Sequence, residues 1–281
     1  MHTIRTAPET VNSSTTATIT EAEFTSIRNY LHDIAGIDLA PSKKTLVMSR
    51  LNKRLRHYNL HNYAQYIALV TGTEHPGERQ MMLDLLTTNE TYFFREPGHL
   101  DFLHDHILPP ENSAKPFRVW SGAASSGEEA YSIAMVLEDK LKGRPWEIIG
   151  TDISNRVLQQ ARSGHYSMAR IEGIPQEYLQ KYCLRGTGPQ EGTLLIDPKL
   201  RQRVSFLQAN LNAKLPDIGM FDVIFLRNVL IYFNNETKRQ IVSRIIDKLN
   251  PWGYFFISHT ETLHGVNETL ERVAPAIYVK S

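Results

Sequence analysis

Hydrophobic positions in the first 90 residues recur with the period of amphipathic helices. Thr20 and Glu23 have the spacing of a capping box, and the apolar stripe that follows them stops at Gly36. A second helix is predicted from Ser42, with apolar positions on one face at Val47, Leu51, Leu55 and Tyr58. The segments HNYAQYIALV and ERQMMLDLL predict two more helices. Residues 19–90 are therefore expected to form a small all-α domain.

Short buried strands alternate with helices after Pro116. FRVWSG, SSGEEAYSIAMVLEDKL and WEIIGTDIS predict a strand, a helix and a strand, and further strands are expected at VSFLQANL, FDVIFLRN, YFFISHTETL and AIYVKS. This alternation is typical of a doubly wound α/β domain with a parallel sheet, here over residues 91–281. The stretch 164–200 does not follow a helical pattern, and it predicts an inserted antiparallel β-subdomain at about 180–200. Residues 1–18 are rich in Ser and Thr and are expected to be a disordered tail.

Composition narrows the classes of protein. Of 281 residues, 41% are hydrophobic, and 31 Lys and Arg nearly balance 30 Asp and Glu, so no overall charge favours nucleic acid or anionic lipid. The single cysteine, Cys183, excludes an internal disulfide framework, and no apolar run resembles a signal peptide or a membrane span. A cytoplasmic location is expected. His104 and His106 do not share a helix face, so no metal site is predicted.

The turn SGAASSGEE follows the first predicted strand, where doubly wound sheets bind ligands. Gly122 and Gly127 are expected to allow close backbone approach, but the turn lacks the GxGxxG spacing of dinucleotide sites. Its acidic pair would repel a diphosphate and suits a zwitterionic cofactor such as S-adenosylmethionine. Glu129 borders the packed helix face and is the candidate for the cofactor's ammonium, whereas Glu128 points nearly opposite. The alternative is that both acids only favour a helix N-terminus.

Polar side chains also follow the other predicted strands. Asp152 ends the second strand, where a carboxylate can accept hydrogen bonds from two ribose hydroxyls; an N-cap role is the alternative, for which Ser154 is better placed. Two strand ends carry an amide beside an apolar side chain and could frame adenine: Asn210 with Leu211, and Asn228 with Val229.

Four blocks, LLTTNETYFFREP, VWSGAASSGEEAYSIAM, GTDIS and FLRNVLIYF, closely resemble the CheR family of chemotaxis receptor methyltransferases over nearly the whole chain after the tail. The resemblance implies methyl transfer from S-adenosylmethionine to receptor glutamates, giving glutamyl methyl esters and S-adenosylhomocysteine. It places the segment 85–97 over the cofactor, with its aromatics anchored between the two domains. It also implies cofactor contacts from Asn89, Thr91, Arg95, Glu129, Asp152, Asn210, Leu211, Asn228 and Val229.

Such a reaction needs positioning more than acid–base catalysis, since a glutamate of pKa about 4.3 is already ionised near neutral pH. Arg95 is predicted to orient a carboxylate of the substrate or of the cofactor, and Tyr232 to donate a hydrogen bond near the reacting centre unless it only packs in the core.

The second helix carries a basic face that is predicted to read acidic receptor helices, consisting of Lys43, Lys44, Arg50, Lys53, Arg54 and Arg56. A solvated helix face is the alternative. The resemblance to the CheR family implies recruitment to membrane receptor arrays, and some members of that family bind a receptor's C-terminal pentapeptide through the β-subdomain. Two other functions remain: a noncatalytic adaptor that binds S-adenosylmethionine, and, less favoured, a nucleic-acid methyltransferase. A nicotinamide dehydrogenase is the least favoured because GxGxxG is missing.

Overall fold

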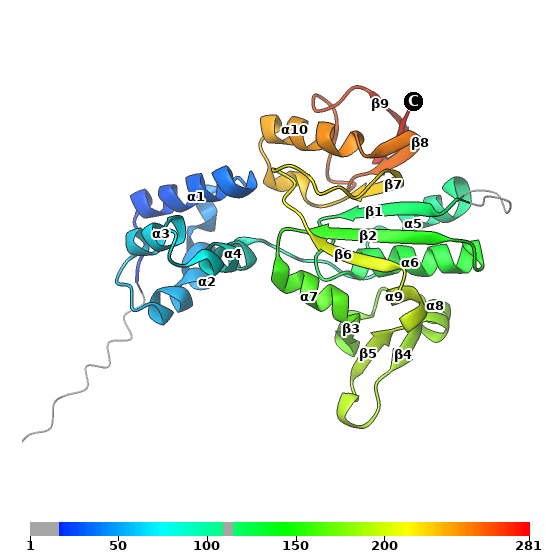
Figure 1. The fold of residues 1–281 in the computed structure, drawn as a ribbon, viewed down its shortest axis with the longest axis horizontal. Coiled ribbons are helices and arrows are strands. Elements are labelled where there is room, and N and C mark those ends of the chain that lie inside the picture. The colour runs from blue at the N-terminus through cyan, green and yellow to red at the C-terminus, as the bar shows by residue number, and fades with distance from the viewer. Residues whose placement is uncertain (1–16, 109–114) are drawn as a thin grey trace, which may run out of the picture.

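The computed structural model describes residues 17–108 and 115–281, so the predicted tail lies outside the described residues except for its last two positions. The chain forms a helical domain followed by a larger α/β domain with a small β-subdomain projecting from it (Figure 1). The predicted boundary near residue 90 falls in the segment that joins the two domains. None of the described helices is long and apolar enough to cross a membrane.

The helical domain has the helices that the sequence predicts. They are α1 (Glu21–Ala35), the 3-10 turn η1 (Pro41–Lys43), α2 (Lys44–His57), α3 (Tyr63–Thr71) and α4 (Pro76–Leu86). Both halves of the Thr20 and Glu23 capping box are present, and Gly36 ends α1 with a left-handed backbone at φ 74°. The apolar faces, among them Phe24, Ile27 and Leu51, bury one another in a core separate from those of the sheet.

The basic face of α2 differs from the prediction that its charges point outward. Arg54 forms two hydrogen bonds, of 2.8 and 2.6 Å, with the buried carboxylate of Glu78 on α4. Arg50 donates to the carbonyls of residues 85–87, where α4 ends and leaves such groups unpaired. These two arginines therefore join α2 to α4 inside the domain.

The α/β domain contains a seven-stranded sheet in the order β6-β2-β1-β7-β8-β10-β9. Its strands are β1 (Phe117–Gly122), β2 (Trp146–Asp152), β6 (Val204–Gln208), β7 (Phe221–Leu226), β8 (Leu249–Phe256), β9 (Leu270–Ala274) and β10 (Ile277–Lys280). The first five of these in spatial order are parallel, as predicted, while β10 is antiparallel to both β8 and β9. The sequence prediction missed β9, and it extended β8 beyond its observed end.

Helices cover both faces of the sheet (Figure 1). Alternate strand residues, such as Val119 and Phe225, pack with α6 (Glu128–Leu141) and α7 (Asn155–Ser163), while Trp120 and Ile224 pack with α10 (Asn235–Ile246). The remaining helical segments are α5 (Pro97–Phe102), the π-helical turn η2 (Leu103–Ile107), α9 (Pro198–Arg201) and the 3-10 turn η5 (Leu230–Tyr232). The doubly wound fold is confirmed.

The β-subdomain is a three-stranded antiparallel sheet in the order β3-β5-β4. Two strands, β4 (Cys183–Arg185) and β5 (Thr193–Ile196), fall within the predicted 180–200 region. The third strand, β3 (His165–Ser167), lies before this region. The pattern of residues 164–200 predicts no helix, but the segment contains α8 (Gln176–Tyr182). Two 3-10 turns, η3 (Met168–Arg170) and η4 (Gly188–Gln190), complete it.

The helical domain contacts the sheet beside the carboxyl ends of its strands. The Asn210 side chain donates to the Ile34 carbonyl at 2.6 Å, and the Asp38 amide donates to the Tyr232 carbonyl at 2.8 Å. Gln80 on α4 donates to the carbonyl of Ile153, just after β2. The two domains thus enclose the edge of the sheet where ligands bind in this fold.

Candidate active site

A cavity of about 340 Å³ lies where the carboxyl ends of the parallel strands meet the helical domain. That size is typical of a small-molecule site. Its lining includes every residue predicted for the cofactor or for catalysis, namely Asn89, Thr91, Arg95, Glu129, Asp152, Asn210, Leu211, Asn228, Val229 and Tyr232. The sequence prediction therefore converges on one place in the structure.

Asp152 is held at the end of β2 by backbone amides. Its two carboxylate oxygens accept hydrogen bonds from the amides of Ser125 and Ser154, each at 2.9 Å. Burial raises the pKa of Asp152 to about 6 despite these bonds. Ser154 occupies the N-cap position of α7, but its side chain makes no capping bond, so the capping role expected for it is wrong. Asp152 is a rigidly oriented acceptor on the cavity wall.

Glu129 at the start of α6 faces the cavity as predicted, whereas Glu128, which was expected to point away from the packed face of the helix, is buried. Glu129 faces the cavity, where it accepts a 2.7 Å bond from the Ser121 hydroxyl and pairs with Arg227 at 3.2 Å. Burial raises the pKa of Glu129 even though Arg227 and Ser121 oppose it. Glu128 is fully buried on the other side, paired with Arg170 at 2.6 Å. A favourable charge interaction with the N-terminus of α6 therefore does not by itself account for the contacts of either carboxylate.

Gly122 and Gly127 have no room for a side chain, because atoms of the protein itself lie beside them. A Cβ on Gly127 would lie 2.9 Å from the Cβ of Ala161, and its backbone has φ 94°. A Cβ on Gly122 would lie 3.0 Å from the Leu226 side chain. Both glycines serve the packing and turn geometry of the protein itself.

The segment that joins the domains passes over the cavity with Arg95 half-buried. The Arg95 guanidinium donates to the Glu90 carbonyl at 3.2 Å and lies over the Tyr92 ring. Phe93 is fully buried in the core of the α/β domain, and Phe94 packs on Tyr178 of the β-subdomain. The aromatics therefore anchor the segment to the α/β domain, not between the two domains as expected.

The two amides expected to frame adenine differ in what they already bind. Both ends of the Asn210 side chain are engaged, by the Ile34 carbonyl and by the Asn212 amide. Asn228 has a left-handed backbone with φ 58°, and its side-chain nitrogen donates to Ser258 at 2.7 Å, which leaves its side-chain oxygen for another partner. Leu211 and Val229 supply apolar lining beside them.

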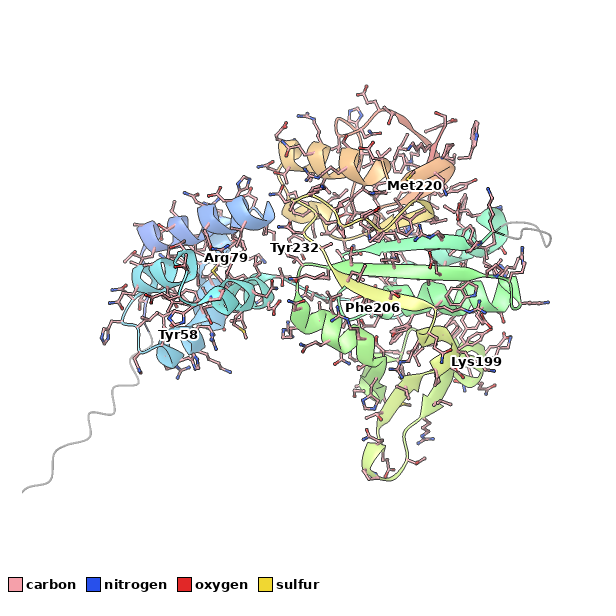
Figure 2. The ribbon with its side chains drawn as sticks, viewed as in Figure 1. Tyr58, Arg79, Lys199, Phe206, Met220 and Tyr232 are labelled. Carbon is pink, nitrogen blue, oxygen red and sulfur yellow. The ribbon has the colours of Figure 1, made fainter. Side chains whose placement is uncertain are left out.

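Tyr232 comes from η5 and lines the cavity instead of only packing in the core. It lies on the side of the sheet that faces the helical domain (Figure 2). Burial raises the pKa of Tyr232, so its hydroxyl keeps its proton and can donate. Of the six basic residues predicted to bind substrate, Lys43 also lines the cavity. Lys44 pairs with Glu21, and Lys53 and Arg56 are exposed.

Sequence reasoning missed a buried polar network behind the cavity. Arg227 contacts Glu96, Glu129 and the Arg95 carbonyl. A further carboxylate, Glu261, accepts hydrogen bonds from the amides of Asn228 and Ser258. One signal was available: an arginine directly after the buried run FDVIFL needs a partner inside the protein.

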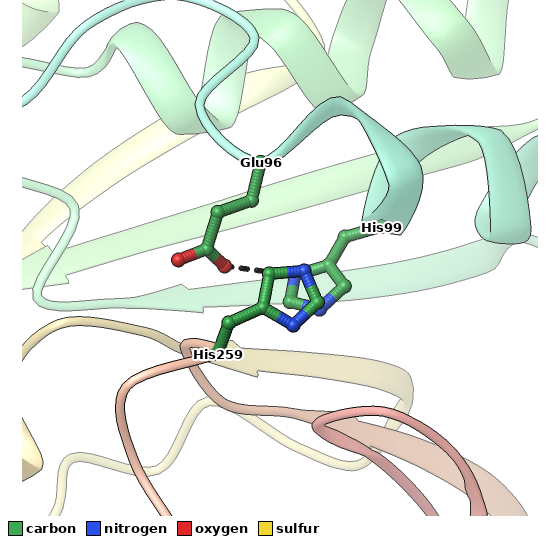
Figure 3. Close-up of side chains that lie close together, drawn as sticks. All are labelled: Glu96, His99 and His259. Carbon is green, nitrogen blue, oxygen red and sulfur yellow. Dashed lines mark ion pairs between the residues drawn. The ribbon is translucent and has the colours of Figure 1, made fainter.

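Glu96, His99 and His259 bring possible metal ligands together, a group that the sequence prediction did not include (Figure 3). Their ligand atoms all lie within 4.8 Å of one another. The Arg227 guanidinium already lies 3.1 Å from the same Glu96 oxygen that faces His99. These residues fit a charge network better than a metal site.

Comparisons with known proteins agree with this geometry. Residues 22–87 match the family model "CheR methyltransferase, all-alpha domain", and residues 89–279 match "CheR methyltransferase, SAM binding domain". The chain is 39% identical over 266 residues to the chemotaxis protein methyltransferase of Escherichia coli K12, covering 94% of this chain and 92% of that protein. It is 39% identical over 262 residues to chemotaxis protein methyltransferase 2 of Pseudomonas aeruginosa, covering 92% and 93%. The chain therefore belongs to the CheR methyltransferase family and is an S-adenosylmethionine-dependent methyltransferase.

Proposed function

We propose that this methyltransferase acts on glutamate side chains of methyl-accepting chemotaxis receptors, forming glutamyl methyl esters and S-adenosylhomocysteine. The observation that carries the proposal is the convergence of all ten predicted side chains on one cavity in a chain of this family. The enzyme works in the cytoplasm, at receptor arrays on the membrane, and meets the receptors' cytoplasmic signalling domain.

The chemistry of the cavity wall fits S-adenosylmethionine. Asp152 offers a buried carboxylate for the ribose hydroxyls, and Glu129 offers another for the ammonium. Arg95 can hold a carboxylate, of the cofactor or of the receptor glutamate, with two donors, and Leu211 and Val229 provide apolar surface for adenine. Asn89, Thr91, Asn210 and Asn228 complete the polar lining. The net charge of the acidic groups suits a cofactor that carries two positive centres and one negative centre.

The residues of the chain contribute binding, orientation and exclusion of water. The bound cofactor supplies an electrophilic methyl group on a sulfonium. The receptor carboxylate needs no base because it is already ionised near neutral pH. Arg95 and the Tyr232 hydroxyl are the donors that can orient its oxygens, and the segment above the cavity limits hydration of the anion.

Receptor docking is assigned to the exposed part of the basic face on α2. Lys53 and Arg56 are exposed and can meet acidic receptor side chains. Lys43 lies at the cavity, where it can attract the glutamate that reacts. Lys44, Arg50 and Arg54 already have partners in the helical domain, so their share in docking is the smaller one.

The test uses membranes that carry chemoreceptors and S-adenosylmethionine with a tritiated methyl group. Label on the receptor that mild base releases as methanol is expected, and Arg95→Ala should remove it. Arg203→Ala is the matched control, because Arg203 stacks on Trp146 away from the cavity. Base-stable label, or cofactor binding without any receptor label, would overturn the proposal; the second result would favour a noncatalytic adaptor.

A further inference from the structure

Arg227 occupies a buried position at the end of β7, from which it reaches two other segments of the active site. Its side chain is 2% exposed. Nη1 lies 3.2 Å from a Glu129 oxygen, while Nη2 lies 3.1 Å from a Glu96 oxygen and donates to the Arg95 carbonyl at 2.5 Å. One guanidinium therefore connects the end of β7, the start of α6 and the segment above the cavity.

Arg227 alone does not neutralise the carboxylates around it. Two carboxylates, Glu96 and Glu129, share its guanidinium, and the positive charge of Arg95 also acts on Glu129. Burial would raise the pKa of Glu96, but Arg227 and Ser258 bring it below its usual value. Glu129 remains the carboxylate whose charge is less well compensated, and it is the one that faces the cavity. A cation in the cavity would complete the network.

Glu96 is itself fixed, so Arg227 has a rigid support on its far side. The Ser258 hydroxyl donates to Glu96 at 2.8 Å, and the backbone at Glu96 is left-handed with φ 54°. His99 is 1% exposed, and its Nδ1 lies 3.3 Å from Glu96 Oε2, the oxygen that pairs with Arg227 (Figure 3). Its ring lies near the Pro275 carbonyl, but neither nitrogen makes a well-aligned hydrogen bond. Glu96 therefore fixes the position of Arg227, and Arg227 in turn orients Glu129.

We propose that Arg227 is a positioning residue that keeps Glu129 ionised and directed at the ammonium of the cofactor, and that holds the Arg95 segment in place through its carbonyl. The inference rests on the proposed role of Glu129 as the ammonium ligand. It assigns no contact between Arg227 and the substrate. Its consequence is selective: ligands that carry the ammonium should depend on Arg227, and ligands that lack it should not.

The experiment measures by calorimetry the affinities of S-adenosylhomocysteine and of 5′-methylthioadenosine, which keeps adenosine but lacks the amino acid. Arg227→Met should weaken S-adenosylhomocysteine at least tenfold and change 5′-methylthioadenosine less than twofold. Arg227→Lys, which restores the charge, should recover most of the loss. Arg118→Met is the matched control, because Arg118 likewise donates to backbone carbonyls, those of Ile218 and Met220, outside the cavity. It should leave both affinities unchanged.

Glu129→Gln separates the inference from the function on which it rests. If Glu129→Gln weakens both ligands equally or neither, Glu129 is not the ammonium ligand and the proposed site fails. If it weakens S-adenosylhomocysteine selectively while Arg227→Met weakens both ligands alike, Arg227 is merely structural and the inference is overturned. Should Arg227→Met not fold, Arg227→Gln keeps two donors without the charge, and the same selective loss is expected of it.

Discussion

Two arginines in this molecule, Arg54 and Arg227, pair with carboxylates that are buried or partly buried, but the surroundings of the two pairs differ. Arg54 meets one carboxylate, Glu78, which also accepts hydrogen bonds from Tyr58 and Tyr66. That network is complete within the helical domain. Arg227 meets two carboxylates, one of which faces a cavity. The balanced Arg54 network stabilises the fold, whereas the Arg227 network has a carboxylate that is open to a charged ligand.

The balanced network should show the largest effect on stability. Glu78→Ala leaves Arg54 without its partner in a mostly buried position, and breaking such a pair costs about 3–5 kcal/mol of unfolding free energy. Chemical denaturation followed by circular dichroism measures it. Glu21→Ala is the control, since Glu21 pairs with Lys44 at the surface and should cost at most about 1 kcal/mol. Equal losses in the two variants would show that burial of the pair is unimportant.

Acid should remove the contribution of Glu78. Burial alone would raise its pKa, but hydrogen bonds from Arg54, Tyr66 and Tyr58 hold the pKa of Glu78 below its usual value. A carboxylate with a lowered folded-state pKa stabilises the protein above its unfolded pKa of about 4.3, and this stability is lost as the pH falls through the folded pKa. The difference in unfolding free energy between wild type and Glu78→Ala should therefore shrink below about pH 4.

The same contrast explains what the sequence could reveal. Periodicity gave the helical domain and the sheet, because core packing repeats along the chain, and position at strand ends gave Asp152 and Asn228. Strand β9 was missed because its pattern is weak: four of its five residues, from Glu271 to Ala274, are not buried. The partners of Arg50, Arg54 and Arg227 lie 24 or more residues away along the chain. No local pattern therefore distinguishes an outward charge from a buried one.

At the cavity, Asp152 should produce the next largest effect. Hydrogen bonds to a charged group contribute about 1.5–3 kcal/mol, so Asp152→Asn should weaken 5′-methylthioadenosine roughly tenfold to a hundredfold at pH 7. 5′-Methylthioadenosine has the ribose but no ammonium group, so Glu129 does not contribute to its binding. Asp139→Asn is the control, because Asp139 pairs with Lys181 elsewhere on the surface. Unchanged binding by Asp152→Asn would break the assignment of ribose to this wall.

The pH dependence of the same binding sharpens the assignment. The ribose hydroxyls donate to the ionised form of Asp152, whose pKa burial raises to about 6. Proton linkage then predicts that affinity for 5′-methylthioadenosine rises about tenfold between pH 5 and pH 7 and levels off above. In Asp152→Asn the affinity should be flat over this range.

Tyr232 should affect turnover and not cofactor binding. Its hydroxyl stays protonated because burial raises its pKa, and it lines the cavity from η5. Tyr232→Phe is expected to lower kcat about tenfold, the lower end of what a hydrogen bond to a charged group contributes. The dissociation constant of S-adenosylhomocysteine should change less than twofold. A loss of cofactor affinity equal to the loss of kcat would instead place this hydroxyl on the cofactor.

The smallest effect on activity is expected from the exposed part of the basic face of α2, because the charges there are solvated. Lys53→Glu combined with Arg56→Glu should raise the KM for receptor roughly threefold to tenfold at low salt, since exposed ion pairs contribute about 0.2–1 kcal/mol each. The effect should fade at high ionic strength because salt screens solvent-exposed charges. Lys140→Glu combined with Lys199→Glu changes the net charge equally on α6 and α9 and should leave KM unchanged. If both double variants raise KM alike, receptor attraction depends on overall charge, and the helical domain has no docking face of its own.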